Sequence, residues 1–253
     1  MQLQPYIDLE FNAPIWRMEI DELNDTLLLE VRDIPNRQVS FAGVDLNRAH
    51  LNFKDLTLPE RWLSGLEAAN NGVMLVHGFQ GETVPVHKGL TAVDGVNGNV
   101  LWSDYNIIFE STNHEGFIVS DARIQPKKYF NIDAKTGQRT VDQRITEITD
   151  IKKSNIQYPI TVTIDEIPTG LNANVYGNEV HYLSHNNFRI VSLHALCEGV
   201  LTQHLYVLNG DDIPVFEDLI AGQIQKLQPE AFISYKNKLI WLKNRSVLKV
   251  LNL

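Results

Sequence analysis

The sequence is poor in cysteine and in uninterrupted hydrophobic runs. Cys197 is the single cysteine among 253 residues, so no intrachain disulfide can form and no cysteine-rich zinc site is possible. No window approaches the ~20 consecutive apolar residues of a membrane helix. The first eight residues have neither the basic start nor the apolar run of a signal peptide. We therefore expect a cytoplasmic protein that does not bind membranes.

Basic residues are also scarce. The chain has 22 Lys and Arg against 31 Asp and Glu, a formal net charge of -9. Because most of such a surface repels phosphate, we expect no nucleic-acid partner. Hydrophobic residues make up 43% and charged residues 21%, which is typical of a globular chain that folds alone. We expect a monomer.

Long helical stripes are almost absent, and short apolar runs alternate with polar residues between Asn/Asp/Gly turns, which predicts an all-β protein. Similar segments recur along the chain. Trp16 and Trp62 lie 46 residues apart, Asp45 and Asp94 lie 49 apart, and Asp133 follows Asp94 after 39. A repeat of roughly 40 to 50 residues with about four strands is typical of a β-propeller blade.

The spacing predicts one β-propeller domain over residues 1–253 with about five four-stranded blades, or six. The expected blades cover 15–53, 61–103, 105–142, 178–219 and 229–253. A strand at 6–11 has no other place, so we expect it to complete the last blade and close the ring, which removes an unpaired sheet edge. Residues 143–177 are either an insertion or a degenerate sixth blade.

The third-to-fourth strand connection carries a recognisable pattern. The segment 89–102, which reads Gly-Leu-Thr-Ala-Val-Asp-Gly-Val-Asn-Gly-Asn-Val-Leu-Trp, resembles the repeat of pyrroloquinoline-quinone-type propellers. Residues 129–141, with Asp-Ala-Lys-Thr-Gly at 133–137, resemble it too, although Val141 stands where the repeat has tryptophan. Phe53 replaces that tryptophan in the first copy. The chain as a whole is similar to an uncharacterised bacterial family, which implies the same architecture and contributes no activity.

These repeat residues have a structural explanation. Asp94 can cap the turn with its carboxylate, Gly98 can supply a positive φ, and Trp102 can pack between neighbouring blades. The quinone enzymes of this type gather cofactor and metal ligands at the axis of larger propellers, and the chain offers no matching set. We therefore expect this chain to have blades of this type and not to bind the quinone cofactor.

The histidines do not predict a metal site. His181 and His185 lie four apart on an expected strand, roughly 13 Å from each other, which is too far for one ion, with His194 nearby. His194 and Cys197 lie three apart on a strand and point to opposite faces, so they do not form a nucleophile and its base. We expect Cys197 to be a buried small hydrophobe.

Carboxylates and glycines also match no catalytic pattern. The acidic pairs Asp21-Glu22, Asp211-Asp212 and Glu217-Asp218 are expected to be solvated loop charge, although two carboxylates opposed across a cleft could hydrolyse glycosides. Residues 94–98 lack the ligand alternation of a calcium loop. Residues 78–81 lack the Lys-Ser/Thr of a phosphate loop. No catalytic residue is predicted.

Two functions remain open. The first is a non-enzymatic scaffold that binds a protein or a small ligand through its loops, above all those at 70–71, 79–87 and 123–128. The second is a hydrolase that acts on a sugar or other small polar substrate in an axial pocket. Carboxylates or histidines that converge in such a pocket, with shifted pKa values, would favour the hydrolase.

Overall fold

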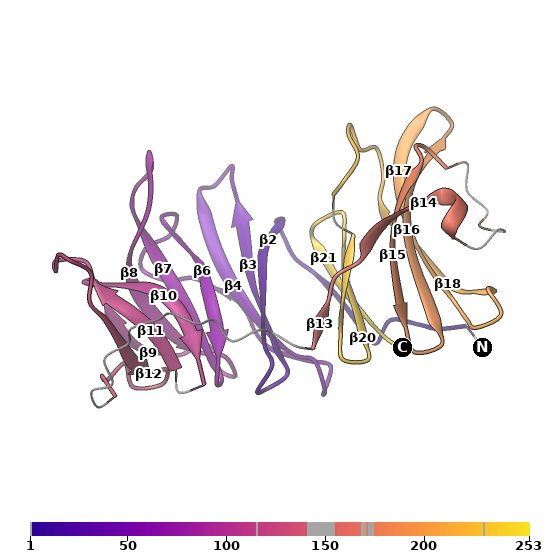
Figure 1. Cartoon of the computed structure of the whole chain (residues 1–253). Helices are drawn as coiled ribbons and strands as arrows, with labels where there is room; N and C mark the ends of the chain where they lie inside the picture. The colour runs from indigo at the N-terminus through magenta and orange to yellow at the C-terminus, as the bar shows by residue number, and fades with distance from the viewer. Residues whose placement is uncertain (1, 115, 141–154, 168–170, 172–174, 230) are drawn as a thin grey trace. The chain divides into compact units, whose positions relative to one another are not determined.

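The chain is all-β and its sheets are antiparallel, as the sequence predicts (Figure 1). The computed structural model describes residues 2–114, 116–140, 155–167, 171, 175–229 and 231–253. Two compact units are present. The first unit is Ile15–Lys153, and the second combines Met1–Pro14 with Ser154–Leu253.

The first unit contains three sheets whose strands follow chain order. One sheet comprises β2 (Ile15–Asp21), β3 (Thr26–Asp33), β4 (Gln38–Asp45) and β5 (His50–Leu56). The next comprises β6 (Ser64–Asn70), β7 (Val73–Gly81), β8 (Val84–Asp94) and β9 (Val100–Asp104). The third comprises β10 (Ile107–Asn113), β11 (Gly116–Asp121) and β12 (Tyr129–Asp133). Four-stranded antiparallel meanders are the unit from which propeller blades are built.

The turns between third and fourth strands follow the predicted design. The Asp94 carboxylate accepts the backbone N–H groups of Val96 at 2.8 Å and Asn97 at 3.1 Å, and Gly98 has φ +75°. Asp133 accepts equivalent bonds from residues 135 and 136, and Gly137 has φ +68°. The capping role of aspartate and the positive φ of glycine are therefore confirmed.

The fourth strands place the repeat aromatics as expected. Phe53 pairs with Gly43, and Trp102 pairs with Ala92, which are equivalent positions in the two sheets. The Trp102 indole N–H donates to the Ala134 carbonyl at 2.9 Å, so this side chain links the sheets β6–β9 and β10–β12. Packing of Trp102 between successive repeats is confirmed.

The second unit contains two five-stranded sheets. One comprises β14 (Ile160–Thr163), β15 (Glu179–His185), β16 (Phe188–Cys197), β17 (Val200–Leu208) and β18 (Pro214–Ala221). The other has the order β1 (Ile7–Glu10), β21 (Val247–Asn252), β20 (Lys238–Lys243), β19 (Phe232–Tyr235), β13 (Ile156–Gln157). The predicted pairing of the N-terminal strand is present, with Ile7 opposite Val250.

Residues 143–177 are described only in part, because 143–154, 168–170 and 172–174 lie outside the described residues. The described part supplies β13 to one sheet of the second unit and β14 to the other, followed by the short 3-10 helix η1 (Ile164–Glu166). In the described part of the chain, no helix is long and apolar enough to cross a bilayer.

Candidate functional site

A β-bulge in strand β6 determines the position of Glu67. Leu66 pairs with Val76 and Ala68 pairs with Leu75, so Glu67 has no residue opposite it in β7. A bulge interrupts the regular alternation of a strand and can redirect a side chain. Here it accompanies a carboxylate that is only 9% exposed.

A second irregularity brings His87 beside His77. In the pairing of β7 with β8, His77 lies opposite Leu90 while Phe79 lies opposite His87. Between these two pairs β8 therefore has two residues, Lys88 and Gly89, where β7 has one. Gly89 has φ +78°, a conformation that glycine adopts without strain. His77 itself faces Gly65, where a Cβ would come within 2.9 Å of the imidazole ring.

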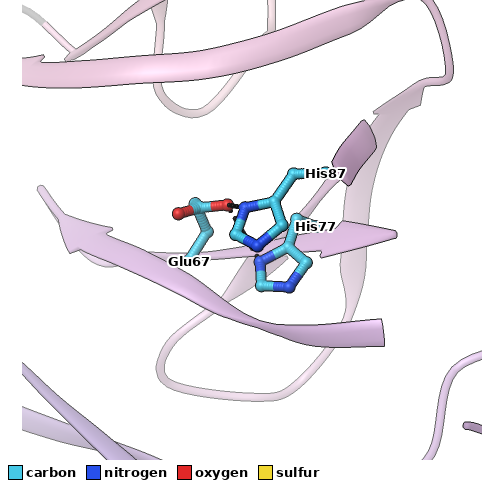
Figure 2. Close-up of side chains that lie close together, drawn as sticks. All are labelled: Glu67, His77 and His87. Carbon is cyan, nitrogen blue, oxygen red and sulfur yellow. Dashed lines mark hydrogen bonds and ion pairs between the residues drawn. The ribbon is translucent and has the colours of Figure 1, made fainter. Parts of the chain in front are cut away.

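The two imidazoles meet on one carboxylate oxygen (Figure 2). The Nδ1 atom of His87 lies 2.7 Å from Oε2 of Glu67, and the Nδ1 atom of His77 lies 2.9 Å from the same oxygen. The rings stack with centroids 3.6 Å apart and planes inclined by 7°. Phe79 packs its ring edge-on against both imidazoles.

This cluster is largely withdrawn from water. His77 is 4% exposed, whereas the His87 side chain is 37% exposed and gives the cluster one open side. Burial acts to raise the pKa of Glu67, but the contacts and charge of His77 and His87 outweigh it, so the pKa lies below its usual value. Among the residues that the structure describes, the nitrogens of His77 have no partner in hydrogen-bond geometry, although Nδ1 is close to Glu67. The group could hold a metal ion.

A ladder of tryptophan and arginine side chains lies next to this cluster. The Arg32 guanidinium carbon is 5.8 Å from the Trp16 ring centroid and 5.4 Å from that of Trp62, and Arg37 lies 5.6 Å from Trp62. These distances are typical of cation–π interactions. We call the four residues Trp16, Arg32, Trp62 and Arg37 the Trp–Arg face.

Arg32 is held in position by groups on its own strand and on β6. Its guanidinium pairs with the buried Glu30 carboxylate and donates to the Ser64 carbonyl at 2.8 Å. Glu30 also accepts the backbone N–H of Leu66 at 2.6 Å. Glu30 therefore connects β3 to β6 immediately before the Glu67 bulge. The same carboxylate holds Arg32 of the Trp–Arg face and the backbone beside the Glu67 cluster.

The histidines considered in the sequence lie elsewhere. His181 and His185 are on β15, and His194 on β16 is 4% exposed and accepts the Gln228 backbone N–H at 3.0 Å. Burial lowers the pKa of His194. Among the described residues, these histidines are not part of a group with metal-ligand spacing.

The prediction that Cys197 is buried is wrong. Cys197 is exposed, because β16 ends there and the chain turns through Glu198 and Gly199, both with positive φ. An apolar strand pattern does not reveal where a hairpin leaves the core.

The acidic pairs are not all solvated either. Asp21 is 2% exposed and accepts the backbone N–H groups of Leu23 and Gly72. Asp218 accepts the Trp241 indole N–H at 3.0 Å and pairs with Lys243 at 2.8 Å. These two carboxylates anchor the scaffold, contrary to the expected solvated charge. In the remaining pairs, Asp212 pairs with Arg189, and Glu217 accepts the Tyr206 hydroxyl at 3.1 Å, while Glu22 is half-buried and Asp211 is exposed.

Two of the three candidate loops are held by internal contacts. The Asn70 amide donates to the carbonyls of Asn113 and Gly116. Arg123 pairs with Asp121 at 2.7 Å, and Lys127 pairs with Glu110 at 2.8 Å. The third loop, at 79–87, extends the β7–β8 hairpin and carries His87 together with Glu82, which pairs with Arg37 of the Trp–Arg face.

Sequence reasoning missed Glu67 and His77 and singled out His87 only as the end of a loop. The three residues lie on different strands, and regular strand alternation does not bring them together. An available signal was the glycine opposite His77, since a histidine beside a small residue can pack deeply. The bulges cannot be recognised from the alternation of apolar and polar residues in the sequence.

Comparisons with known proteins give a family of unknown function. A family described as a domain of unknown function (DUF4905) matches residues 20–102, which include Glu67, His77 and His87. No curated protein matches the sequence.

Solved structures give distant likenesses. BamB from Moraxella catarrhalis has 10% identity and a TM-score of 0.35, with 99% of this chain and 100% of that chain covered. Chaetomium thermophilum Raptor has 7% identity and a TM-score of 0.40, with 99% and 29% covered. The β-propeller domain of the Trilobed protease from Pyrococcus furiosus has 11% identity and a TM-score of 0.34, with 94% and 64% covered. At these scores the likenesses do not bear on function.

Proposed function

We propose that this chain is a non-enzymatic binding protein that recognises another protein through the Trp–Arg face. The observation that carries the proposal is the exposure of Trp16. Its side chain is 55% exposed, and the Arg32 guanidinium lies over one face of its ring. An exposed large aromatic beside arginines has the composition of an interaction hot spot.

The fixed position of Arg32 within this face supports binding. Arg32 is fixed by Glu30 and by the Ser64 carbonyl, so its position beside Trp16 and Trp62 is set before any partner arrives. Ordering side chains at an interface costs free energy on association, and a preorganised surface avoids part of that cost.

An exposed apolar residue and an ion pair lie at the edge of the Trp–Arg face. Ile34 is 55% exposed and belongs to the turn that carries Arg37, whose backbone N–H donates to the Ile34 carbonyl at 3.1 Å. Arg37 pairs with Glu82 of the hairpin at 79–87, one of the loops expected to meet a partner. An apolar centre with charged groups at its edge is the usual anatomy of a protein interface.

A hydrolase is supported less well. Carboxylate and imidazole groups do converge at Glu67, but the rings stack on each other and two of the three side chains are buried. A solvent-open hollow of about 530 Å³ lies in the second unit, and its lining has neither carboxylate nor imidazole groups. The lining residues are Tyr176, Leu196, Gly199, Val200, Leu201, Gln223, Ile224 and Gln225.

Affinity purification from the native cells tests the proposal. The wild-type chain, Trp16→Ala and the control Tyr158→Ala are used as baits, and recovered proteins are quantified by mass spectrometry. Tyr158 is 66% exposed and lies in the second unit, so it matches the loss of an exposed aromatic elsewhere. Loss of a hot-spot tryptophan costs about 2 kcal/mol or more, which weakens binding about 30-fold.

We expect a partner that the wild type and Tyr158→Ala recover and Trp16→Ala does not. Circular dichroism of the three purified proteins shows that each bait is folded. If every recovered protein binds Trp16→Ala as well as wild type, the Trp–Arg face is not the recognition surface.

A further inference from the structure

We propose that Glu67, His77 and His87 bind one divalent transition-metal ion of the zinc class. The donor set is two imidazole nitrogens and one carboxylate oxygen, which suits zinc and its neighbours rather than calcium or magnesium, whose sites are built from oxygen. Three protein ligands leave a fourth position for water. The 37% exposure of His87 gives that water access from solvent.

The donor atoms lie close enough to share one ion, although the side chains must rearrange to bind it. All three donor atoms lie within 4.8 Å of one another. The ligands of a tetrahedral zinc ion, with bonds near 2.0–2.1 Å, are separated by about 3.3 Å. Oε2 of Glu67 lies 2.7 and 2.9 Å from the two nitrogens, so the carboxylate must withdraw by about half an ångström to admit the ion. One imidazole must also turn out of the stack, because a ring nitrogen binds an ion in the plane of its ring and the two planes are inclined by only 7°.

The charge balance of the cluster also favours a cation. Glu67 is 9% exposed and His77 is 4% exposed, so an anionic carboxylate here requires a positive charge nearby. One divalent ion balances the carboxylate and uses nitrogen lone pairs of both rings.

The neighbouring sheet of the same unit has a glutamate at the equivalent position. Val73 pairs with Asp94 in one sheet and Gly116 pairs with Asp133 in the next, which aligns their strands. In this alignment Glu67 corresponds to Glu110. Both glutamates sit at bulges, because Phe109 pairs with Val119 and Ser111 pairs with Ile118.

The two bulge glutamates meet different groups. His77 corresponds to Ser120, which donates its hydroxyl hydrogen to Glu110 at 2.5 Å, and Lys127 supplies an ammonium group at 2.8 Å. The carboxylate of the β10–β12 sheet therefore has a cation built into the chain. In the β6–β9 sheet the same position has two imidazoles, and the metal ion takes the place of the ammonium group.

Zinc binding by purified protein tests the assignment. The full chain is prepared without a histidine tag, stripped with a chelator, and titrated with ZnCl₂ in a calorimeter. We expect one ion per chain, and binding weakened by about 100-fold or more in Glu67→Gln and in His87→Ala, since even outer-shell changes cost 10 to 100-fold. Glu110→Gln is the matched control, with the same substitution at the equivalent bulge, and should bind as wild type does.

The proposal is overturned if the wild type does not bind zinc, or if Glu67→Gln and His87→Ala bind it as well as Glu110→Gln. A measurement on the wild type alone removes any dependence on the folding of variants. Nitrogen-15 NMR of the histidine rings should show Nδ1 of both His77 and His87 shifting on addition of zinc. Unchanged spectra for these two rings would equally exclude the site. Neither experiment involves a protein partner, so the outcome is separate from that of the Trp–Arg face.

Discussion

At the scale of single residues, the Glu67 cluster forms because irregularities in two strand pairings bring His77 and His87 to one carboxylate. The burial of Asp21 and Asp218 likewise depends on distant partners.

The space that His77 occupies depends on Gly65. A Cβ at this position would lie 2.9 Å from Cε1 and Nε2 of His77, so the ring must move. We expect Gly65→Ala to destabilise the chain by about 1–3 kcal/mol, as overpacking does. Gly81→Ala is the control in the same sheet, since a Cβ there meets no atom within 4 Å. Urea unfolding of both variants measures the difference, and equal stabilities would contradict this account of His77.

The carboxyl of Asp121 should make stability depend on pH. Hydrogen bonds from the Arg123 guanidinium and backbone N–H lower the pKa of Asp121 from 3.8 to about 2. A carboxyl whose pKa is lower in the folded chain stabilises the fold above pH 3.8, and this contribution is lost as the pH falls towards 2. The free energy of unfolding of wild type should therefore fall more steeply over this interval than that of Asp121→Asn. Parallel curves for the two proteins would show that the pair with Arg123 does not form in solution.

The roles of single residues in turns could be predicted from the sequence, whereas the Glu67 cluster could not. Asp94 and Gly98 could be assigned their roles because a capping carboxylate and a positive φ depend on five consecutive residues. Glu67, His77 and His87 could not be grouped in advance, because their proximity depends on irregularities in two strand pairings.

At the scale of elements, the repeat could be predicted and its deviations could not. Alternation of apolar residues and the recurring aspartate turns identify the strands of the first unit, and Phe53 and Trp102 occupy the equivalent places inferred from spacing. Bulges at Glu67 and Glu110 keep the strand pattern and change only which residue lacks a partner. The candidate site arises at such a deviation, which is common where a sheet has acquired a function.

The turn after Asp45 departs from the repeat in a testable way. Ala49 has φ +52°, whereas Gly98 has φ +75° at the equivalent place. In this left-handed region a residue with a Cβ is strained by roughly 1–2 kcal/mol. Replacing it with glycine relieves that strain, but part of the gain in stability is lost because glycine has greater conformational freedom in the unfolded chain. We expect Ala49→Gly to stabilise the chain by about 0.5 kcal/mol and Gly98→Ala to destabilise it by about 1 kcal/mol. Thermal unfolding measures both, and a destabilising Ala49→Gly would contradict the turn assignment.

At the scale of the whole molecule, both ends of the chain contribute to one unit. Strand β1 pairs with β21, so the second unit is completed by residues that precede the first unit in sequence. This pairing was predictable, since the strand at residues 6–11 had no other neighbour. The contributions of β13 and β14 to two different sheets were not, because strands of two and four residues carry too little pattern to assign a partner.

The two proposed sites both belong to the first unit. They share Glu30, which holds Arg32 of the Trp–Arg face and the backbone of Leu66 beside the Glu67 bulge. We propose that the bulged β6–β9 sheet brings three donor groups from three strands together as one ligand site. Net charge and composition of the chain gave no indication of it.

Anomalous diffraction at the zinc absorption edge tests that claim most directly, on crystals of the untagged chain grown with zinc. We expect an anomalous peak within coordination distance of the Glu67 carboxylate and of Nδ1 in both His77 and His87. A map with no peak there, or with peaks only at other side chains, would contradict it.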